Sequence, residues 1–174
     1  KKLDAANNPV DLYSVELAKE FHRSLYPNEK FEILYPHSSY NIPLQRLGRF
    51  LNLARPSHLG LDLNADYGAW FAYRVAFLTS AEMPEIKKKD WVSPCDTCAK
   101  KPCVQVCPSG ATKTMNFGLS DCANFRFSPD SPCLSRCLAR LACPFKAEHA
   151  YTEEQINYHM MRSADLARLA TFTR

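Results

Sequence analysis

All eight cysteines of this 174-residue chain lie between Cys95 and Cys143. The first four follow the spacing C-x2-C-x4-C-x3-C-P and are Cys95, Cys98, Cys103 and Cys107. A [4Fe–4S] cubane takes one thiolate at each of its four irons, and such closely spaced cysteines ending in Cys-Pro are typical of bacterial iron–sulfur ligand runs. The spacing therefore predicts cluster ligands, which constrain the fold more than any other feature of the chain.

The second group of cysteines is spaced more loosely, x10, x3 and x5, and consists of Cys122, Cys133, Cys137 and Cys143. In proteins with two cubanes, the last cysteine of each run ligates the other cluster. We therefore expect one cluster on Cys95, Cys98, Cys103 and Cys143. The other cluster is expected on Cys107, Cys122, Cys133 and Cys137. Ser131-Pro132 predicts a helix start that would turn Cys133 and Cys137 to the same face.

Two other uses of the cysteines stay open. A disulfide framework needs an even number of cysteines, but it usually belongs to a short secreted chain and spreads along it. Zinc takes four thiolates, and C-x2-C is a zinc half-site, so a zinc-stabilised interaction module is the alternative to an iron–sulfur protein. Free core cysteines are excluded by the number gathered in this one stretch.

The composition excludes several classes of protein. The formal net charge is +4, but each [4Fe–4S] cluster with four thiolates carries −2, so two clusters would cancel it and no nucleic-acid partner is expected. No apolar run approaches the roughly 18 residues of a membrane span, and no export signal is visible, so the prediction is a cytoplasmic protein without a membrane partner. The five glycines form no nucleotide-binding motif.

Hydrophobic periodicity predicts the elements before the cysteines. Helices are expected from Pro9 to Leu25 and from Pro43 to Leu51, each with an apolar buried face, and a short strand over Phe31–Tyr35. The turn-rich residues 64–68 indicate a hairpin between the apolar runs 59–63 and 69–79. Residues 70–78 are apolar on both faces, as in a central strand, with Arg74 as their only charge.

The rest of the chain completes an α+β prediction. Residues 82–89 indicate a linker, and Thr152 and Gln155 form a capping box that begins a helix running from Glu153 to about Leu169. The expected division is an α/β scaffold over 1–90, a two-cluster module inserted at 91–147, and a C-terminal helix over 148–174 that packs back on the scaffold.

Two stretches carry a resemblance to a known family. Residues 60–74 resemble the strand-turn-strand of the cobalamin-processing (methylmalonic aciduria and homocystinuria type C) family, whose fold is nitroreductase-like. Residues 151–158 look like that family's helix start. The resemblance implies a small sheet with flanking helices, and it implies that Arg74 and Trp70 lie at a pocket for cobalamin or flavin.

The cysteine module is similar to other families. A cobalamin fold joined to two cubanes resembles epoxyqueuosine reductase and the reductive dehalogenases, whose clusters feed a corrinoid. Small bacterial ferredoxin-like proteins share Cys-x2-Cys-Ala-x2-Pro-Cys and the segment Cys137–Pro144. These likenesses imply single-electron relay through two [4Fe–4S] clusters to a redox partner protein or to a corrinoid or flavin acceptor. The alternative they imply is a cobalamin- or flavin-dependent reductase, and a homodimer is compatible with either.

Overall fold

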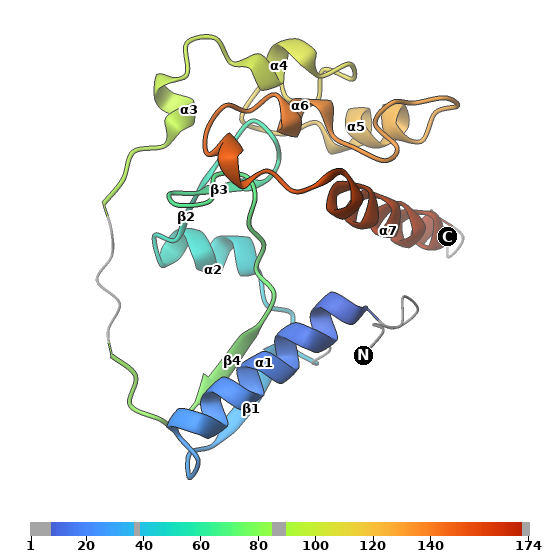
Figure 1. Cartoon of the computed structure of the whole chain (residues 1–174). Helices are drawn as coiled ribbons and strands as arrows, with labels where there is room; N and C mark the ends of the chain where they lie inside the picture. Colours follow the sequence, from blue (N-terminus) through green and yellow to red (C-terminus); the bar gives the residue numbers. More distant parts are fainter. Residues whose placement is uncertain (1–7, 37–38, 85–89, 172–174) are drawn as a thin grey trace. The chain divides into compact units, whose positions relative to one another are not determined.

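The computed structural model describes residues 8–36, 39–84 and 90–171, with side chains described as far as Arg162. The chain divides into two compact units (Figure 1). The first unit comprises Lys1–Gly48 and Ala72–Lys88, and the second comprises Arg49–Phe71 and Lys89–Arg174. This division differs from the expected boundary at residue 90, because residues 49–71 group with the cysteine-rich part. Residues 85–89 of the expected linker lie outside the described residues.

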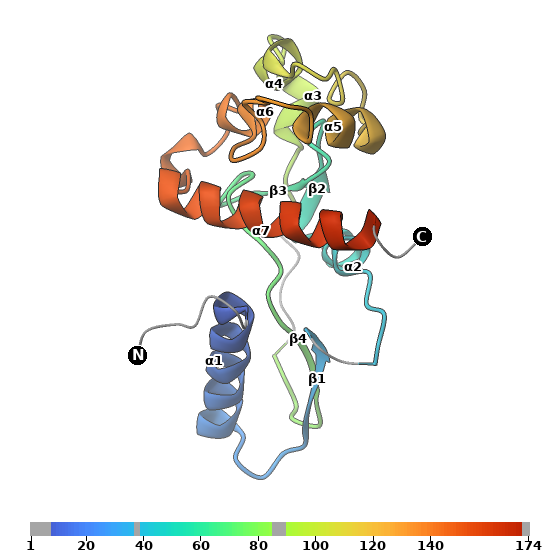
Figure 2. The same ribbon diagram turned by 90° about the vertical axis from the view of Figure 1, so that its right-hand side faces the viewer.

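The first unit contains one helix and one pair of strands. Helix α1 (Pro9–Leu25) lies alongside β1 (Phe31–Tyr35) and β4 (Ala76–Thr79), which pair antiparallel with Phe31 opposite Thr79 (Figure 2). His22 of α1 is buried, and its Nε2 lies 2.7 Å from Thr79 Oγ1. Its ring centroid lies 4.8 Å from that of Phe31, so a histidine contributes to the contact between the helix and the strands.

The expected helices and strand are present, but the predicted buried faces are wrong. In the predicted apolar stripe of α1, Val10 is partly buried and the other four residues are exposed, namely Tyr13, Leu17, Phe21 and Leu25. In α2 (Leu44–Phe50), the side chain of Phe50 is 74% exposed, and the buried residue is Gly48. A Cβ at Gly48 would overlap the phenol ring of Tyr73, so that side chain would have to move to make room for it. Periodicity identifies an apolar face, but it does not show whether other residues cover that face.

The predicted hairpin and central strand are also wrong. Residues 59–63 contribute to β3 (Asp62–Asn64), which pairs antiparallel with β2 (Ala54–Pro56), whereas residues 69–79 contribute β4, which pairs with β1. Only Ala76–Thr79 of the expected central strand is extended in a sheet, and that sheet has two strands among the described residues. The turn itself does form, because Asn64 and Gly68 exchange two backbone hydrogen bonds of 2.9 Å.

The second unit contains the cysteines, carried on short helices. These are α3 (Pro94–Thr97), α4 (Pro102–Val106), α5 (Leu119–Arg126) and α6 (Leu138–Leu141), followed by a 3-10 turn (Ala147–His149) and α7 (Glu153–Thr171). The predicted capping box of α7 is confirmed: Thr152 N–H donates to Gln155 Oε1 at 2.9 Å, and Gln155 N–H donates to Thr152 Oγ1 at 3.3 Å. The fold is therefore α+β, with two small antiparallel strand pairs among the described residues.

The buried core of the second unit joins residues 59–69 to the cysteine-bearing segments. It is formed by Leu59, Leu63, Ala69, Cys103 and Ala139. The side chains of Cys95, Cys107, Cys137 and Cys143 pack against this core. Cysteines that were predicted as ligands thus lie at the edge of the apolar core, where burial makes a charged thiolate costly without a bound cation. None of the described helices is long and apolar enough to cross a membrane.

Gly68 allows the turn at residues 64–68 to pack closely against Phe145, which follows the last cysteine. Gly68 has φ of 58°, and a Cβ there would lie 2.5 Å from the carbonyl oxygen of Phe145. Gly110 has φ of 70°, but its nearest neighbour is the flexible end of Lys113.

We expect Gly110→Ala to lower the free energy of unfolding by about 1 kcal/mol through backbone strain, and Gly68→Ala by about 2–4 kcal/mol because overpacking adds to that strain. Urea unfolding measures both values, and equal losses would contradict the contact with Phe145.

Candidate metal centre

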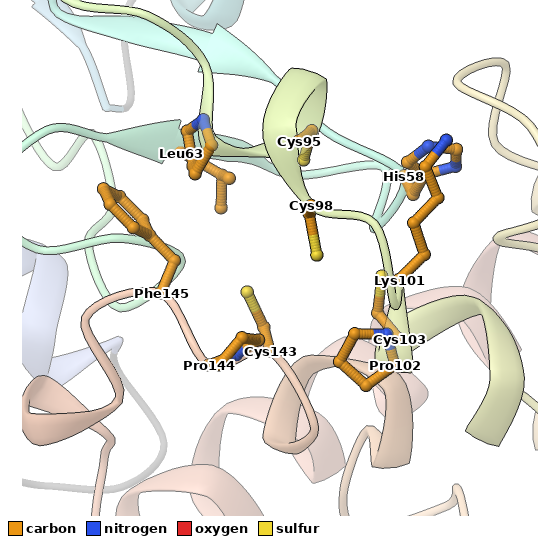
Figure 3. Close-up of a pocket in the computed structure, with 11 residues that line it drawn as sticks. His58, Leu63, Cys95, Cys98, Lys101, Pro102, Cys103, Cys143, Pro144 and Phe145 are labelled. Carbon is orange, nitrogen blue, oxygen red and sulfur yellow. The ribbon is translucent and has the colours of Figure 1, made fainter.

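Four thiols line one cavity of the second unit. The cavity has a volume of about 310 Å³, and the thiols belong to Cys95, Cys98, Cys103 and Cys143. In Figure 3, the thiols of Cys98 and Cys143 point toward each other across this cavity. Leu63, Pro102, Pro144 and Phe145 supply apolar walls. We call this space the first cavity, and it brings together the cysteines that the sequence predicts for one cluster.

Local backbone geometry explains why the first three of these thiols converge. Ser93 caps α3, since its Oγ accepts a hydrogen bond of 3.3 Å from Cys95 N–H, and Pro94 occupies the first helical position. Lys101 has φ of 39°, in the left-handed region, and Pro102 begins the next helix immediately afterwards. The chain therefore reverses between Cys98 and Cys103 within one tight turn, which brings two short helices to the same cavity.

The other four thiols line a second, narrower cavity of the same unit. It has a volume of about 40 Å³, and its thiols belong to Cys107, Cys122, Cys133 and Cys137. The helix predicted after Ser131-Pro132 is wrong, because residues 132–135 form turns and bends and α6 begins only at Leu138. Ser131 Oγ still accepts from Cys133 N–H at 3.3 Å, so the serine caps a turn instead of a helix. Cys133 and Cys137 nevertheless line the same cavity.

Helix α4 connects the two cavities. Cys103 lies near its start and lines the first cavity, and Cys107 follows its last residue and lines the second. Thr112 ties both ends together: its Oγ1 donates to Cys103 O at 3.1 Å, and it also hydrogen-bonds the Cys107 thiol. His58 Nδ1 donates to the Thr112 carbonyl at 2.9 Å, so its Nε2 is the unprotonated nitrogen when the ring is neutral. The cavities thus share a wall that these hydrogen bonds hold together.

Burial disfavours the charged form of most of these thiols. It raises the pKa of five of them, namely Cys95, Cys103, Cys122, Cys137 and Cys143. Burial acts in the same direction on Cys107, but hydrogen bonds with Ser109 and Thr112 outweigh it and lower the pKa of that thiol. A bound cation stabilises thiolates in such a site, because its charge offsets the desolvation of the sulfur.

Positive side chains also line both cavities. Lys101 lines the first cavity, and Arg126 and Arg136 line the second. Burial lowers the pKa of Arg126, and negative charge on the thiols of the second cavity opposes that shift. Guanidinium groups beside thiolates partly neutralise the charge that a cluster would bring.

The two residues proposed from resemblance lie in different units and have internal contacts. Trp70 belongs to the second unit and is 5% exposed, with the Arg140 guanidinium 4.4 Å above its ring and Tyr151 5.4 Å away. Arg74 belongs to the first unit, where its Nη1 lies 3.9 Å from Asp11 Oδ1. A cobalamin or flavin site at these residues stays a prediction.

The structure adds residues that the cysteine pattern does not single out. Arg140 follows Cys137 by three positions and donates through Nε to Ala69 O at 3.1 Å, which ties α6 to the Trp70 segment. One helical turn of separation is the only sequence signal for it. Thr112 and His58 have no local signal, because their contacts join residues far apart in the chain.

Among the side chains that the structure describes, which end at Arg162, no three from histidine, cysteine, aspartate or glutamate gather as ligands of one metal ion. The four thiolates of a cubane bind four different irons, so that group requires ligands spread around a larger space.

No family model, curated protein or solved structure matches this chain. The function is therefore inferred from the two thiol cavities themselves.

Proposed function

We propose that this chain is an electron-transfer protein that holds one [4Fe–4S] cluster in each thiol cavity. The observation that carries the proposal is the grouping of the thiols into two sets of four. Each set takes one member from the opposite stretch of sequence: Cys143 joins the early cysteines, and Cys107 joins the late ones. Exchange of the last ligand between runs is the pairing that two adjacent cubanes use.

The donor chemistry agrees with this occupant. Both sets consist of thiols alone, and thiolates are soft ligands that suit iron–sulfur clusters, zinc and monovalent copper. When bound, a [4Fe–4S] cluster accepts and releases single electrons without large movements of its ligands. The chain's own thiolates would ligate it, and Leu63 and Phe145 supply apolar walls to the first cavity.

The protein also orients donors toward the sulfur atoms. The backbone N–H groups of His58 and Val104 hydrogen-bond Cys95 and Cys103 in the first cavity. The backbone N–H groups of Ala139 and Arg140 do the same for Cys137 in the second cavity. Such hydrogen bonds stabilise negative charge on the sulfurs and so favour the reduced state of a cluster. A redox partner protein would supply and collect the electrons.

Trp70 and Arg74 support no second proposal. Trp70 is buried beneath Arg140, and Arg74 pairs with Asp11, so both side chains already have structural contacts. Zinc is the remaining competitor for the thiols, because it too is held by four thiolates.

Metal and sulfide analysis distinguishes these occupants. Protein purified without oxygen is expected to contain about eight iron atoms and eight acid-labile sulfides per chain, four of each in every cluster. Chelated apoprotein should regain both after reconstitution with iron and sulfide, and it serves as the control. Zinc bound in the absence of labile sulfide would overturn the proposal.

A further inference from the structure

The two cavities differ in how their positive side chains are held. Arg126 is the last residue of α5, one helical turn after Cys122, and it lines the second cavity. Its Nη2 donates to the carbonyl oxygens of Met160 in α7 and Leu134 in the loop between two ligands, the latter at 3.5 Å. These carbonyls fix the guanidinium at the wall of the cavity.

The cation of the first cavity is less constrained. Lys101 lines that cavity, but the residue is exposed. An ammonium on a flexible stem in contact with water is strongly hydrated, and solvent and salt screen its charge. Its effect on a cluster in the first cavity is therefore weaker than that of a guanidinium held in place.

Burial of the thiols does not by itself order the two clusters. Cys103, in the first cavity, is the one buried cysteine, and the other seven cysteines are partly buried. Exclusion of water alone disfavours the more negative, reduced state of a cluster. It also lowers the local dielectric, so a cation inside such a site acts more strongly than one in water. Two guanidinium groups line the second cavity, but Arg136 is exposed and its Nη1 lies 4.0 Å from Glu153 Oε1, so Arg126 is the one that acts against the cost of excluding water.

Hydrogen bonds reach thiols of both cavities, so they raise both reduction potentials and do not by themselves separate them. Cys107 Sγ lies 3.4 Å from Ser109 Oγ and also interacts with Thr112. Cys137 accepts from two backbone N–H groups, those of Ala139 and Arg140. Donors to ligand sulfurs raise the reduction potential of a cluster.

From these contacts we propose that Arg126 raises the reduction potential of the cluster in the second cavity above that of the cluster in the first cavity. The proposal rests on the proposed function. One electron then passes from the first cluster, which is oxidised by one unit, to the second cluster, which is reduced by one unit. Arg126 would act on the cluster through the electric field of its positive charge, and it would not ligate iron.

The test is a potentiometric titration of the whole protein with both clusters, followed by electron paramagnetic resonance. Two reduction steps are expected. Arg126→Gln removes the charge and should shift the higher step to a more negative potential while leaving the lower step in place. Arg126→Lys keeps the charge and should retain most of the original value. Arg136→Gln, at an exposed position in the same cavity, should shift the same step by a smaller amount.

A variant that lacks one predicted ligand shows which of the two clusters has the higher reduction potential. Cys143→Ala removes a predicted ligand of the first cluster, so the step that remains should be the higher one. A remaining step at the lower potential would overturn the proposal, as would unchanged potentials in an Arg126→Gln protein with its full iron and sulfide content. If the Arg126→Gln protein loses its clusters, Arg126→Met is titrated instead, and the same shift of the higher step to a more negative potential is expected. Wild-type protein without iron and sulfide would instead refute the proposed function itself.

Discussion

Two double substitutions are expected to give opposite results even though each removes two cysteines. Cys98→Ala with Cys143→Ala removes two thiols from the first cavity, so about four iron atoms and four sulfides per chain should remain in the second. Cys98→Ala with Cys107→Ala removes one thiol from each cavity, so both clusters should be lost. Iron and sulfide analysis of the two proteins, prepared side by side without oxygen, measures the difference.

The two double variants distinguish two ways of grouping the cysteines, because grouping them in simple sequence order predicts the reverse results. If the first four cysteines formed one cluster and the last four the other, the pair Cys98 and Cys107 would share a cluster, and Cys98 and Cys143 would not. Each double variant is thus the matched control of the other, with the same number of thiols removed. Retention of iron by the Cys98/Cys107 variant, together with its loss from the Cys98/Cys143 variant, would show that the ligands do not cross between the runs.

Removal of the Trp70 side chain is expected to cause a large loss of stability. Trp70 is 5% exposed and lies between the Arg140 guanidinium, 4.4 Å from its ring, and the ring of Tyr151, 5.4 Å away. Trp70→Ala should lower the free energy of unfolding by about 3–5 kcal/mol, because it leaves a cavity and removes the aromatic face beneath the partly buried guanidinium of Arg140. Urea unfolding of the protein with its clusters measures this loss.

An exposed aromatic residue in the same unit provides the control for that loss. Phe50 is 74% exposed, and Phe50→Ala should change the unfolding midpoint little, since surface substitutions are usually worth within about 0.5 kcal/mol. Trp70→Phe keeps an aromatic face and should fall between the two. Equal midpoints for Trp70→Ala and Phe50→Ala would contradict a structural role for the stack with Arg140.

Local signals predicted the elements that depend on local contacts. Helix α1 begins at Pro9, and α7 begins at a capping box whose two hydrogen bonds join Thr152 and Gln155, as the sequence indicates. The predicted hairpin between residues 59–63 and 69–79 does not form, because β4 pairs with β1 and not with the neighbouring β3. The paired residues Phe31 and Thr79 are far apart in sequence. Periodicity contains no information about a partner so distant.

The candidate site was predictable in part for a related reason. Cysteine spacing indicates which thiols can converge in a turn, and the structure gathers the same two sets of four around two cavities. Their occupancy by clusters stays a proposal. The contact of Arg126 with the Met160 carbonyl was not predictable, because it joins α5 to α7 across residues that share no local pattern. The stack of Arg140 on Trp70 is hidden from the sequence for the same reason.

The most direct test of two clusters is electron paramagnetic resonance of the protein reduced with dithionite under anaerobic conditions. Because α4 separates the two sets of thiols by one short helix, the reduced clusters would be close enough for their spins to interact. We expect a broadened, split signal that integrates to about two spins per chain, one for each cluster. A silent spectrum from protein that contains no labile sulfide, or one uncoupled spin per chain at full reduction, would contradict two adjacent [4Fe–4S] clusters.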